Sequence, residues 1–303
     1  MENQWPILSY ENGKETYATL HMWTQIVGKI NLAVAPWINH SWHITQHLTP
    51  SGLSTHKMPY KNKSFQIDFD FIDHKLKVIT SDGEFRDFDL AGNSVADFYR
   101  KIFEVLRGLG IDLKINSTPV EMVNPIPFEK DTVNATYDKT QASDLHQALL
   151  KMQNVLTHMR CNFTGKCSPV HFFWGSFDLA VSRFSGRKAP VHPGGIPNLP
   201  DWVAQEAYSH EVASFGFWPG NEALPEAAFY TYLYPEPEGY KDAEVRPKGA
   251  YYHETLREFI LPYSTVQKST EPDVMLLEFL NSTYEAGATL AKWDRDAIET
   301  KHD

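Results

Sequence analysis

The sequence predicts an α+β fold built from two αββββα units, each an antiparallel sheet with helices packed on one face. Two observations lead to this prediction. Hydrophobic residues recur at helical spacing at both ends of each half and at alternating spacing between those ends. The order helix, several strands, helix also occurs twice within 303 residues. We therefore divide the chain into an N-terminal unit (1–116), a connector (117–142) and a C-terminal unit (143–303).

The N-terminal unit opens with a helix over residues 16–35, where Leu20, Trp23 and Val27 share one face and Pro36 stops the helix. Four strands are expected next: one that His43 opens, and three with the sequences SFQIDFDFI (64–72), HKLKVIT (74–80) and EFRDFDL (84–90). Ser94 and Asp97 then form a capping box that begins a second helix. Gly110 ends this helix, so the unit is closed at both ends by helices.

The C-terminal unit repeats this order over a longer stretch. We expect a helix at 143–163, strands near 169–184, 208–218, 227–235 and 249–262, and a last helix at 271–292. Two segments, 185–207 and 235–249, are insertions relative to the first unit. Long loops in compact domains are often binding loops or lids, so the functional site is expected in this half.

The two halves also align residue by residue. When residue numbers in the first half are shifted by 129, the apolar stripe of the first helix coincides with that of the helix at 143–163. At a shift of 128, His43 coincides with His171. The stripe pairs Leu20, Trp23, Val27, Ile30 and Val34 with Leu149, Met152, Leu156, Met159 and Phe163. We interpret this as an ancient duplication. The alternative is that any two amphipathic helices align in this way.

Composition excludes several classes of protein. The net charge is −10 and the Lys and Arg residues are scattered, which argues against a nucleic-acid surface. No apolar run of about 18 residues predicts a membrane span, and the N-terminus does not have the pattern of a secretory signal. Two cysteines do not make a disulfide framework, so a reducing cytoplasm is the expected location.

The segment SPVHFFWGSFDLAVSRFSGRKAP (168–190) carries ionisable residues inside an aromatic strand. Burying an unpaired charge is costly, so His171, Asp178 and Arg183 are expected to have partners or a ligand. Strand alternation predicts His171 and Arg183 on one face, and Trp174 and Asp178 on the other. Arg183 and Arg187 bracket a Ser-Gly turn and are candidates for binding an anion. The alternative is a buried pair between Asp178 and an arginine.

Further candidates come from other strands and from the first helix. His210 is a candidate acid or base, because an imidazole side chain suits this role near neutral pH, unless it is a core histidine bonded to a carbonyl. One strand face carries Tyr230, Tyr232 and Tyr234, with Glu236 continuing the alternation. These phenols predict a polar aromatic pocket or, alternatively, a partly exposed sheet face. His21 lies off the apolar stripe of its helix and is a further candidate for substrate contact.

Cofactor and metal motifs were sought along the whole chain. No GxGxxG, P-loop, nucleophile elbow, HExxH or paired CxxC motif occurs. The sequence therefore predicts neither an organic cofactor nor a motif-defined metal site. A divalent metal held by distant residues such as His171, His210 and Glu236 stays open as an alternative.

Long motifs make the chain similar to a known family. The segments ATLHMWTQIVGK, SPVHFFWGSFDLAVSRFSGR, EAYSHEVASFGFWPG and FLNSTYEAGATLAKWDRDAIE resemble a bacterial family described only as a domain of unknown function. The resemblance covers nearly the whole chain. It implies a soluble bacterial protein and carries no activity, cofactor or catalytic residue.

The functional expectation therefore depends on the residues themselves. We expect a hydrolase or isomerase that acts on a small polar or anionic metabolite, with His171 and His210 as acid–base groups. Glu236 or Asp178 would orient them, and Arg183 or Arg187 would hold an anion. The substrate would also contact Trp174, Tyr230, Tyr232, Tyr234 and His21. The alternatives are a non-catalytic protein that binds a small ligand and an oligomerisation module, such as a homodimer, with an aromatic interface.

Overall fold

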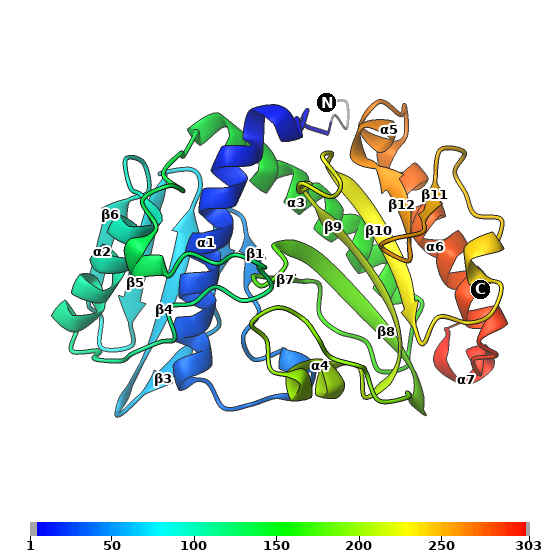
Figure 1. Cartoon of the computed structure of the whole chain (residues 1–303), viewed down its shortest axis with the longest axis horizontal. Coiled ribbons are helices and arrows are strands. Elements are labelled where there is room, and N and C mark those ends of the chain that lie inside the picture. Colours follow the sequence, from blue (N-terminus) through cyan, green and yellow to red (C-terminus); the bar gives the residue numbers. More distant parts are fainter. Residues whose placement is uncertain (1–4, 301–303) are drawn as a thin grey trace.

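The computed structural model describes residues 5–300, which form seven α-helices and two antiparallel six-stranded sheets (Figure 1). The predicted α+β class is confirmed. The first half contains α1 (Tyr10–Val34), η1 (Asn39–Ser41), β1 (His47–Thr49), β2 (Gly52–Ser54), β3 (Met58–Tyr60), β4 (Lys63–Asp70), β5 (Lys75–Thr80), β6 (Phe85–Asp89), α2 (Val95–Gly108) and η2 (Phe128–Lys130). The second half contains α3 (Lys139–Cys161), β7 (His171–Phe173), β8 (Asp178–Lys188), α4 (Asp201–Ala207), β9 (His210–Trp218), β10 (Ala228–Tyr234), η3 (Tyr240–Asp242), β11 (Tyr251–His253), β12 (Glu258–Pro262), α5 (Tyr263–Gln267), α6 (Pro272–Leu290) and α7 (Arg295–Ile298).

The first sheet has the order β1-β2-β4-β5-β6, and β3 also pairs with β4. Along β4 the residues Phe65, Ile67 and Phe69 are buried, while Gln66 and Asp68 between them are half-buried. This alternation is the pattern that predicted the strand. The sequence missed β2 and β3, because three-residue strands are too short to show a period.

The second sheet has the order β7-β8-β9-β10-β12-β11. The single strand predicted near 169–184 is wrong, because residues 174–177 form a turn between β7 and β8. Phe177 adopts a φ of 59° in this turn, which reverses the chain. The turn resets the alternation, so His171 pairs with Ala180 and shares its face, while Arg183 lies on the opposite face.

The two sheets meet at their first strands. Gln46, just before β1, and Phe172 in β7 form an antiparallel bridge. Each residue's N–H donates to the other's carbonyl, at 2.9 Å from Gln46 and 2.7 Å from Phe172. His47 opens β1 as His171 opens β7, whereas His43 precedes the strand that we expected it to begin. Two meandering sheets, each following a long helix, are consistent with the proposed duplication.

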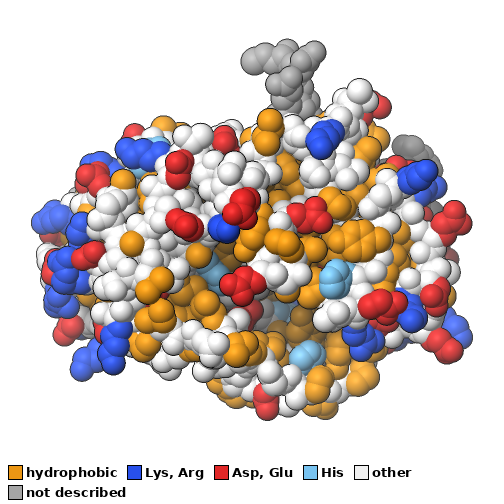
Figure 2. Space-filling model, turned by 45° about the horizontal axis from the view of Figure 1, so that its top comes forward, with side chains coloured by type: hydrophobic (Ala, Val, Ile, Leu, Met, Phe, Trp, Pro, Cys, Tyr) orange, Lys and Arg blue, Asp and Glu red, His pale blue; other side chains and the backbone are white. Residues whose placement is uncertain are grey.

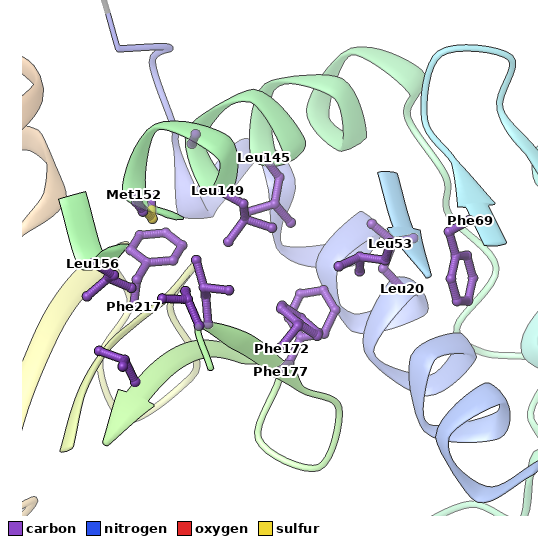
Figure 3. Packing of buried hydrophobic residues seen from close by; sticks show 14 of the residues in the cluster. Leu20, Leu53, Phe69, Leu145, Leu149, Met152, Leu156, Phe172, Phe177 and Phe217 are labelled. Carbon is purple, nitrogen blue, oxygen red and sulfur yellow. The ribbon is translucent and has the colours of Figure 1, made fainter. Parts of the chain in front are cut away.

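One hydrophobic core joins the halves, and α3 lies over its middle (Figure 3). From α3, Leu145 and Leu149 point toward the first half, and Met152 and Leu156 lie beside the second sheet (Figure 3). The same buried cluster includes Leu20, Leu53, Phe69, Phe172, Phe177 and Phe217. The unit boundaries at residues 116 and 142 stay a prediction, although α3 already begins at Lys139 with Asp138 as its N-cap.

Helices α3 and α6 cover one face of the second sheet, where Leu179, Val181, Phe215 and Phe217 are buried. The opposite face is covered by short irregular segments and by α4, which leaves room for a cavity. Among residues 5–300 no helix is long and apolar enough to cross a membrane.

Candidate functional site

A cavity of about 430 Å³ lies on the face of the second sheet that α3 and α6 leave free. Its floor comes from β8, β9, β10 and the start of β12, and its walls come from α4, the connector and the residues around η1. The face shown in Figure 2 is hollowed near its middle, with hydrophobic, acidic and histidine side chains around the hollow. We call this space the acidic cavity, because its lining includes the carboxyl groups of Glu121, Asp178 and Glu258.

The alternation of the three central strands places the floor residues. Asp178, Ala180 and Ser182 of β8 line the cavity, and so do Tyr230 and Tyr232 of β10. Between them on β9, Gly216 pairs with both Ala180 and Tyr230. A Cβ atom at Gly216 would lie 2.4 Å from the Tyr230 hydroxyl, so only glycine leaves room for this phenol.

Asp178 is buried and held by two donors. The Ser176 hydroxyl donates to Oδ1 at 2.6 Å, and the Tyr230 hydroxyl donates a short hydrogen bond to Oδ2. Burial raises the pKa of Asp178 above its ordinary value, while these two hydrogen bonds act in the opposite direction. The carboxyl is therefore fixed in position and harder to ionise than a surface aspartate.

The other two carboxyls face Asp178 from separate segments of the chain. Burial raises the pKa of Glu258 to about 8, and the charge of Asp178 adds to the rise. The same two causes raise the pKa of Glu121 to about 7. The Glu121 side chain is exposed to the cavity, but protein surrounds its carboxyl closely, and a Cβ atom at Gly175 would lie 2.0 Å from its Oε1. Near neutral pH this set holds both protonated and ionised carboxyls.

A pair of phenols continues the polar floor. The hydroxyls of Tyr208, which follows α4, and Tyr232 of β10 are hydrogen-bonded at 2.7 Å. Burial raises the pKa of Tyr208 to about 12. The rings of Tyr230 and Tyr232 stack with centroids 6.1 Å apart. Neutral phenols with fixed hydroxyls orient a ligand by hydrogen bonding.

Polar residues of α1 position the wall that carries Glu121. The Gln25 amide donates to the Val120 carbonyl at 3.0 Å and accepts from the Val120 N–H at 2.9 Å. One turn further along, the Lys29 ammonium donates to the Thr118 carbonyl at 2.7 Å. Glu121 itself adopts a φ of 60° and donates its N–H to the Pro197 carbonyl at 2.8 Å. The connector is thus tied both to α1 and to the segment before α4.

Four residues predicted for the site line the acidic cavity, namely Asp178, Trp174, Tyr230 and Tyr232. Trp174 lies in the turn between β7 and β8 and donates from Nε1 to the Ile44 carbonyl at 2.7 Å. His21 lies behind the wall, with Nε2 2.7 Å from the Gly175 carbonyl. Burial lowers the pKa of His21 to about 4, so its ring is neutral and positions the turn.

The predicted anion clamp is not assembled. Arg183 lies on the core face of the sheet, where it donates to the Met159 carbonyl and its guanidinium packs 4.5 Å from the Tyr284 ring centroid. Arg187 pairs with Glu211 at 2.6 Å and donates to the carbonyls of Ala291 and Lys292, just after α6. Neither guanidinium lines the cavity, and the alternative pair between Asp178 and Arg183 is wrong, because the two residues lie on opposite faces.

The predicted acid–base histidines also lie outside the lining. His171 is buried beside His47 and Trp42, and burial with the neighbouring histidines lowers its pKa to about 3. His210, half-buried at the start of β9, is within 3.1 Å of the Ser209 hydroxyl. Their catalytic roles stay predictions that this geometry does not favour.

The last two predicted residues lie near the ends of β10. Glu236 accepts from the Tyr252 hydroxyl at 2.7 Å and is 3.3 Å from Arg257. Tyr234 donates to the Pro190 carbonyl at 3.1 Å. Both residues therefore support neighbouring segments, and neither lines the acidic cavity.

Sequence reasoning missed Glu121, Tyr208 and Glu258. Glu121 lies in the connector, where a polar residue is unremarkable. Glu258 gave one weak signal, since it precedes the apolar run Phe259-Ile260-Leu261 and so belongs to a strand. Across residues 5–300 no group of three or more His, Cys, Asp or Glu side chains is arranged to hold a metal ion.

Comparison with known proteins assigns the family. The chain belongs to the family described as "Family of unknown function (DUF5996)", whose model matches residues 5–300. Neither the curated proteins nor the solved structures contain a significant match to this chain. The family membership confirms the resemblance and leaves the activity to be argued from the acidic cavity.

Proposed function

We propose that this protein is an enzyme that acts on a small polar molecule by acid–base chemistry in the acidic cavity. The observation that carries the proposal is that Glu121, Asp178 and Glu258, which are far apart in the sequence, line one cavity of about 430 Å³. Cavities of this size are typical of small-molecule sites. Carboxyls with raised pKa values in a cleft are typical of catalytic acids and bases.

The two glutamates suit opposite roles. The pKa of Glu121 is about 7 and that of Glu258 about 8, so near pH 7.5 the favoured state has Glu121 ionised and Glu258 protonated. An ionised carboxylate accepts a proton and a protonated one donates a proton, which is the pairing that general acid–base catalysis requires. Asp178 is fixed by Tyr230 and Ser176 and raises the pKa of both glutamates through its charge.

This assignment replaces the histidine-based one. His171 and His210 do not line the cavity, whereas the carboxyls do. The expected reaction class, a hydrolysis or isomerisation without an organic cofactor, is kept as part of the proposal. The anionic substrate is not kept, because Arg183 and Arg187 are bound elsewhere.

A metabolite-conversion experiment tests the proposal. Wild-type protein and the Glu258→Gln variant would be incubated with a mixture of bacterial metabolites at about pH 7.5, and consumed or formed compounds would be identified by mass spectrometry. We expect conversion of at least one compound by wild type and at least a ~100-fold slower rate in the variant, the range typical of a lost general acid. Glu254→Gln, at an exposed carboxyl paired with Lys241, is the matched control and is expected to convert at the wild-type rate.

The pH dependence gives a second readout. Conversion by wild type should follow a bell-shaped profile whose two apparent pKa values, near 7 and 8, belong to the glutamate pair. If a compound binds in the cavity and none is converted, the protein is a binding protein and the enzymatic proposal is wrong. If nothing binds and the Glu258 variant behaves as wild type, the cavity has no such function.

A further inference from the structure

The charges that line the acidic cavity are all of one sign. Glu121, Asp178 and Glu258 contribute carboxyls, and none of the described lining residues is a lysine or arginine. His40 is the one histidine among them, and both of its ring nitrogens are engaged. Its Nδ1 lies 2.8 Å from the Ala207 carbonyl, and its Nε2 lies 2.7 Å from the Lys166 ammonium.

The ammonium of Lys166, which lies beside lining side chains, is already engaged. Lys166 lies over the rings of Trp42 and Phe184, at 5.3 Å and 5.2 Å from their centroids, and bonds to His40. These three side chains line the cavity, whereas Lys166 does not. An anion in the cavity would therefore face three carboxyls, and the described lining residues include no lysine or arginine to hold it.

Several polar groups of the cavity lack a partner within residues 5–300. The carboxyl of Glu121, which is exposed to the cavity, and that of half-buried Glu258 accept no hydrogen bond and form no ion pair. Ser41, which also lines the cavity and is nine-tenths buried, has an Oγ without a hydrogen-bond partner. A buried polar atom without a partner, such as Ser41 Oγ, is unfavourable, and a ligand with several N–H donors would satisfy this oxygen and the two carboxyls.

Aromatic rings form much of the remaining wall. Trp42, Trp174 and Trp218 line the cavity with Tyr230 and Tyr232, and the rings of Trp218 and Tyr230 lie 4.8 Å apart. The face of an aromatic ring attracts a cation, more strongly where water is excluded. Aromatic walls around carboxylates are the surroundings that favour ammonium groups.

We propose that the ligand of the acidic cavity is a small organic cation, a primary amine or ammonium compound, whose charge is placed among Asp178, Glu121 and Glu258. The inference rests on the proposed function only for the location of the site in the acidic cavity. It does not require the protein to catalyse a reaction. The tryptophan and tyrosine rings then cover the carbon skeleton, and the Tyr208–Tyr232 pair orients a polar end of the ligand.

Cation binding should also release protons. At about pH 7.5 part of the glutamate pair is protonated, and a bound positive charge favours the ionised carboxyls. The other titratable groups that face the glutamates are Asp178, His40, Tyr208, Tyr230 and Tyr232. The phenols stay protonated at this pH, so the released protons come from the carboxyls.

Calorimetric titration with charge-matched compounds tests the proposal. Three skeletons would each be offered as amine, alcohol and carboxylate: tyramine, tyrosol and 4-hydroxyphenylacetate; butane-1,4-diamine, butane-1,4-diol and succinate; phenethylamine, 2-phenylethanol and phenylacetate. We expect at least one amine to bind at least about tenfold more tightly than its alcohol, and its carboxylate not to bind. Titrations in buffers of different ionisation enthalpy measure the protons released on binding. Binding of the amine should release up to about one proton from the carboxyls of the cavity.

Two variants locate the binding. Asp178→Asn should weaken amine binding at least about tenfold, and Glu258→Gln should weaken it and reduce proton release. Glu258→Gln removes a carboxyl whose burial opposes folding, so loss of binding in this variant is not loss of the fold. Glu254→Gln should bind as wild type, because its carboxyl is exposed and paired with Lys241.

The outcomes separate this inference from the enzymatic proposal. Equal or tighter binding of an alcohol or carboxylate, or no binding by any of the three amines, overturns the cationic ligand. Amine binding that survives Asp178→Asn and Glu258→Gln also overturns it. Amine binding without conversion of any compound supports the cation and overturns only the enzyme. Conversion of a neutral or anionic compound in this cavity supports the enzyme and overturns the cation.

Discussion

Replacing Glu258 by glutamine should stabilise the protein, and more strongly as the pH rises. In the folded chain the pKa of Glu258 is about 8, against an ordinary value of 4.5. Since the folded pKa of this acid is raised, folding takes up a proton between these two values. Its contribution to stability is therefore most favourable below about pH 4.5 and is lost as the pH rises toward 8.

The size of the effect follows from the two pKa values. Each tenfold change in proton affinity corresponds to about 1.4 kcal/mol. At pH 7.5 the unfolded chain is ionised at this glutamate and the folded chain is mostly protonated, which opposes folding by about 4 kcal/mol. At pH 5.5 the corresponding figure is about 1.4 kcal/mol. Wild type should thus lose about 2.5 kcal/mol between these pH values relative to Glu258→Gln, whose amide does not titrate.

Urea unfolding followed by tryptophan fluorescence measures this difference. The free energy of unfolding of wild type, Glu258→Gln and Glu254→Gln would be compared at about pH 5.5, 6.5 and 7.5. The advantage of Glu258→Gln should grow steadily over this range, while Glu254→Gln follows wild type. An advantage that stays constant with pH would show that Glu258 titrates as a solvated carboxyl, and the argument for its burial in the cavity would then be wrong.

Three other substitutions test the supports of the cavity. Gln25→Ala removes the hydrogen bonds that hold Val120 of the connector and the Gly175 carbonyl to α1, and we expect the free energy of unfolding in urea to fall by about 1–3 kcal/mol and ligand binding to weaken. Arg183→Met should leave binding unchanged in calorimetry, because the guanidinium lies on the core face; a selective loss of binding would restore the predicted anion clamp. Gly216→Ala should displace Tyr230, since the added Cβ lies 2.4 Å from its hydroxyl, and should lower stability by about 1–3 kcal/mol; unchanged stability and binding would contradict this packing.

Local periodicity made much of the fold predictable. The stripe of Leu20, Trp23 and Val27 lies buried along α1, and the alternation of β4 is present as expected. Ser94 accepts from the Asp97 N–H at 3.1 Å in the predicted capping box of α2. These features depend on residues within a few positions of one another, so one sequence is enough to reveal them.

One error shows the limit of such local patterns. The aromatic run from His171 to Arg183 looks like a continuous strand, yet a four-residue turn divides it into β7 and β8. Gly175 and Ser176 are common turn residues, but Phe177, which adopts the positive φ, is not one. Because alternation is counted from the start of a strand, this turn reversed the predicted faces of His171 relative to Arg183.

The sequence by itself determined the class of fold, the strand face that carries Tyr230 and Tyr232, and the buried position of Asp178. Only the tertiary structure decided that Glu121, from the connector, and Glu258, from β12, meet Asp178 in one cavity. The physical reason is that the raised pKa values of these carboxyls arise from desolvation and from a charge brought near by packing. Both causes depend on residues that are far apart in the sequence, so no local sequence pattern predicts the raised pKa values.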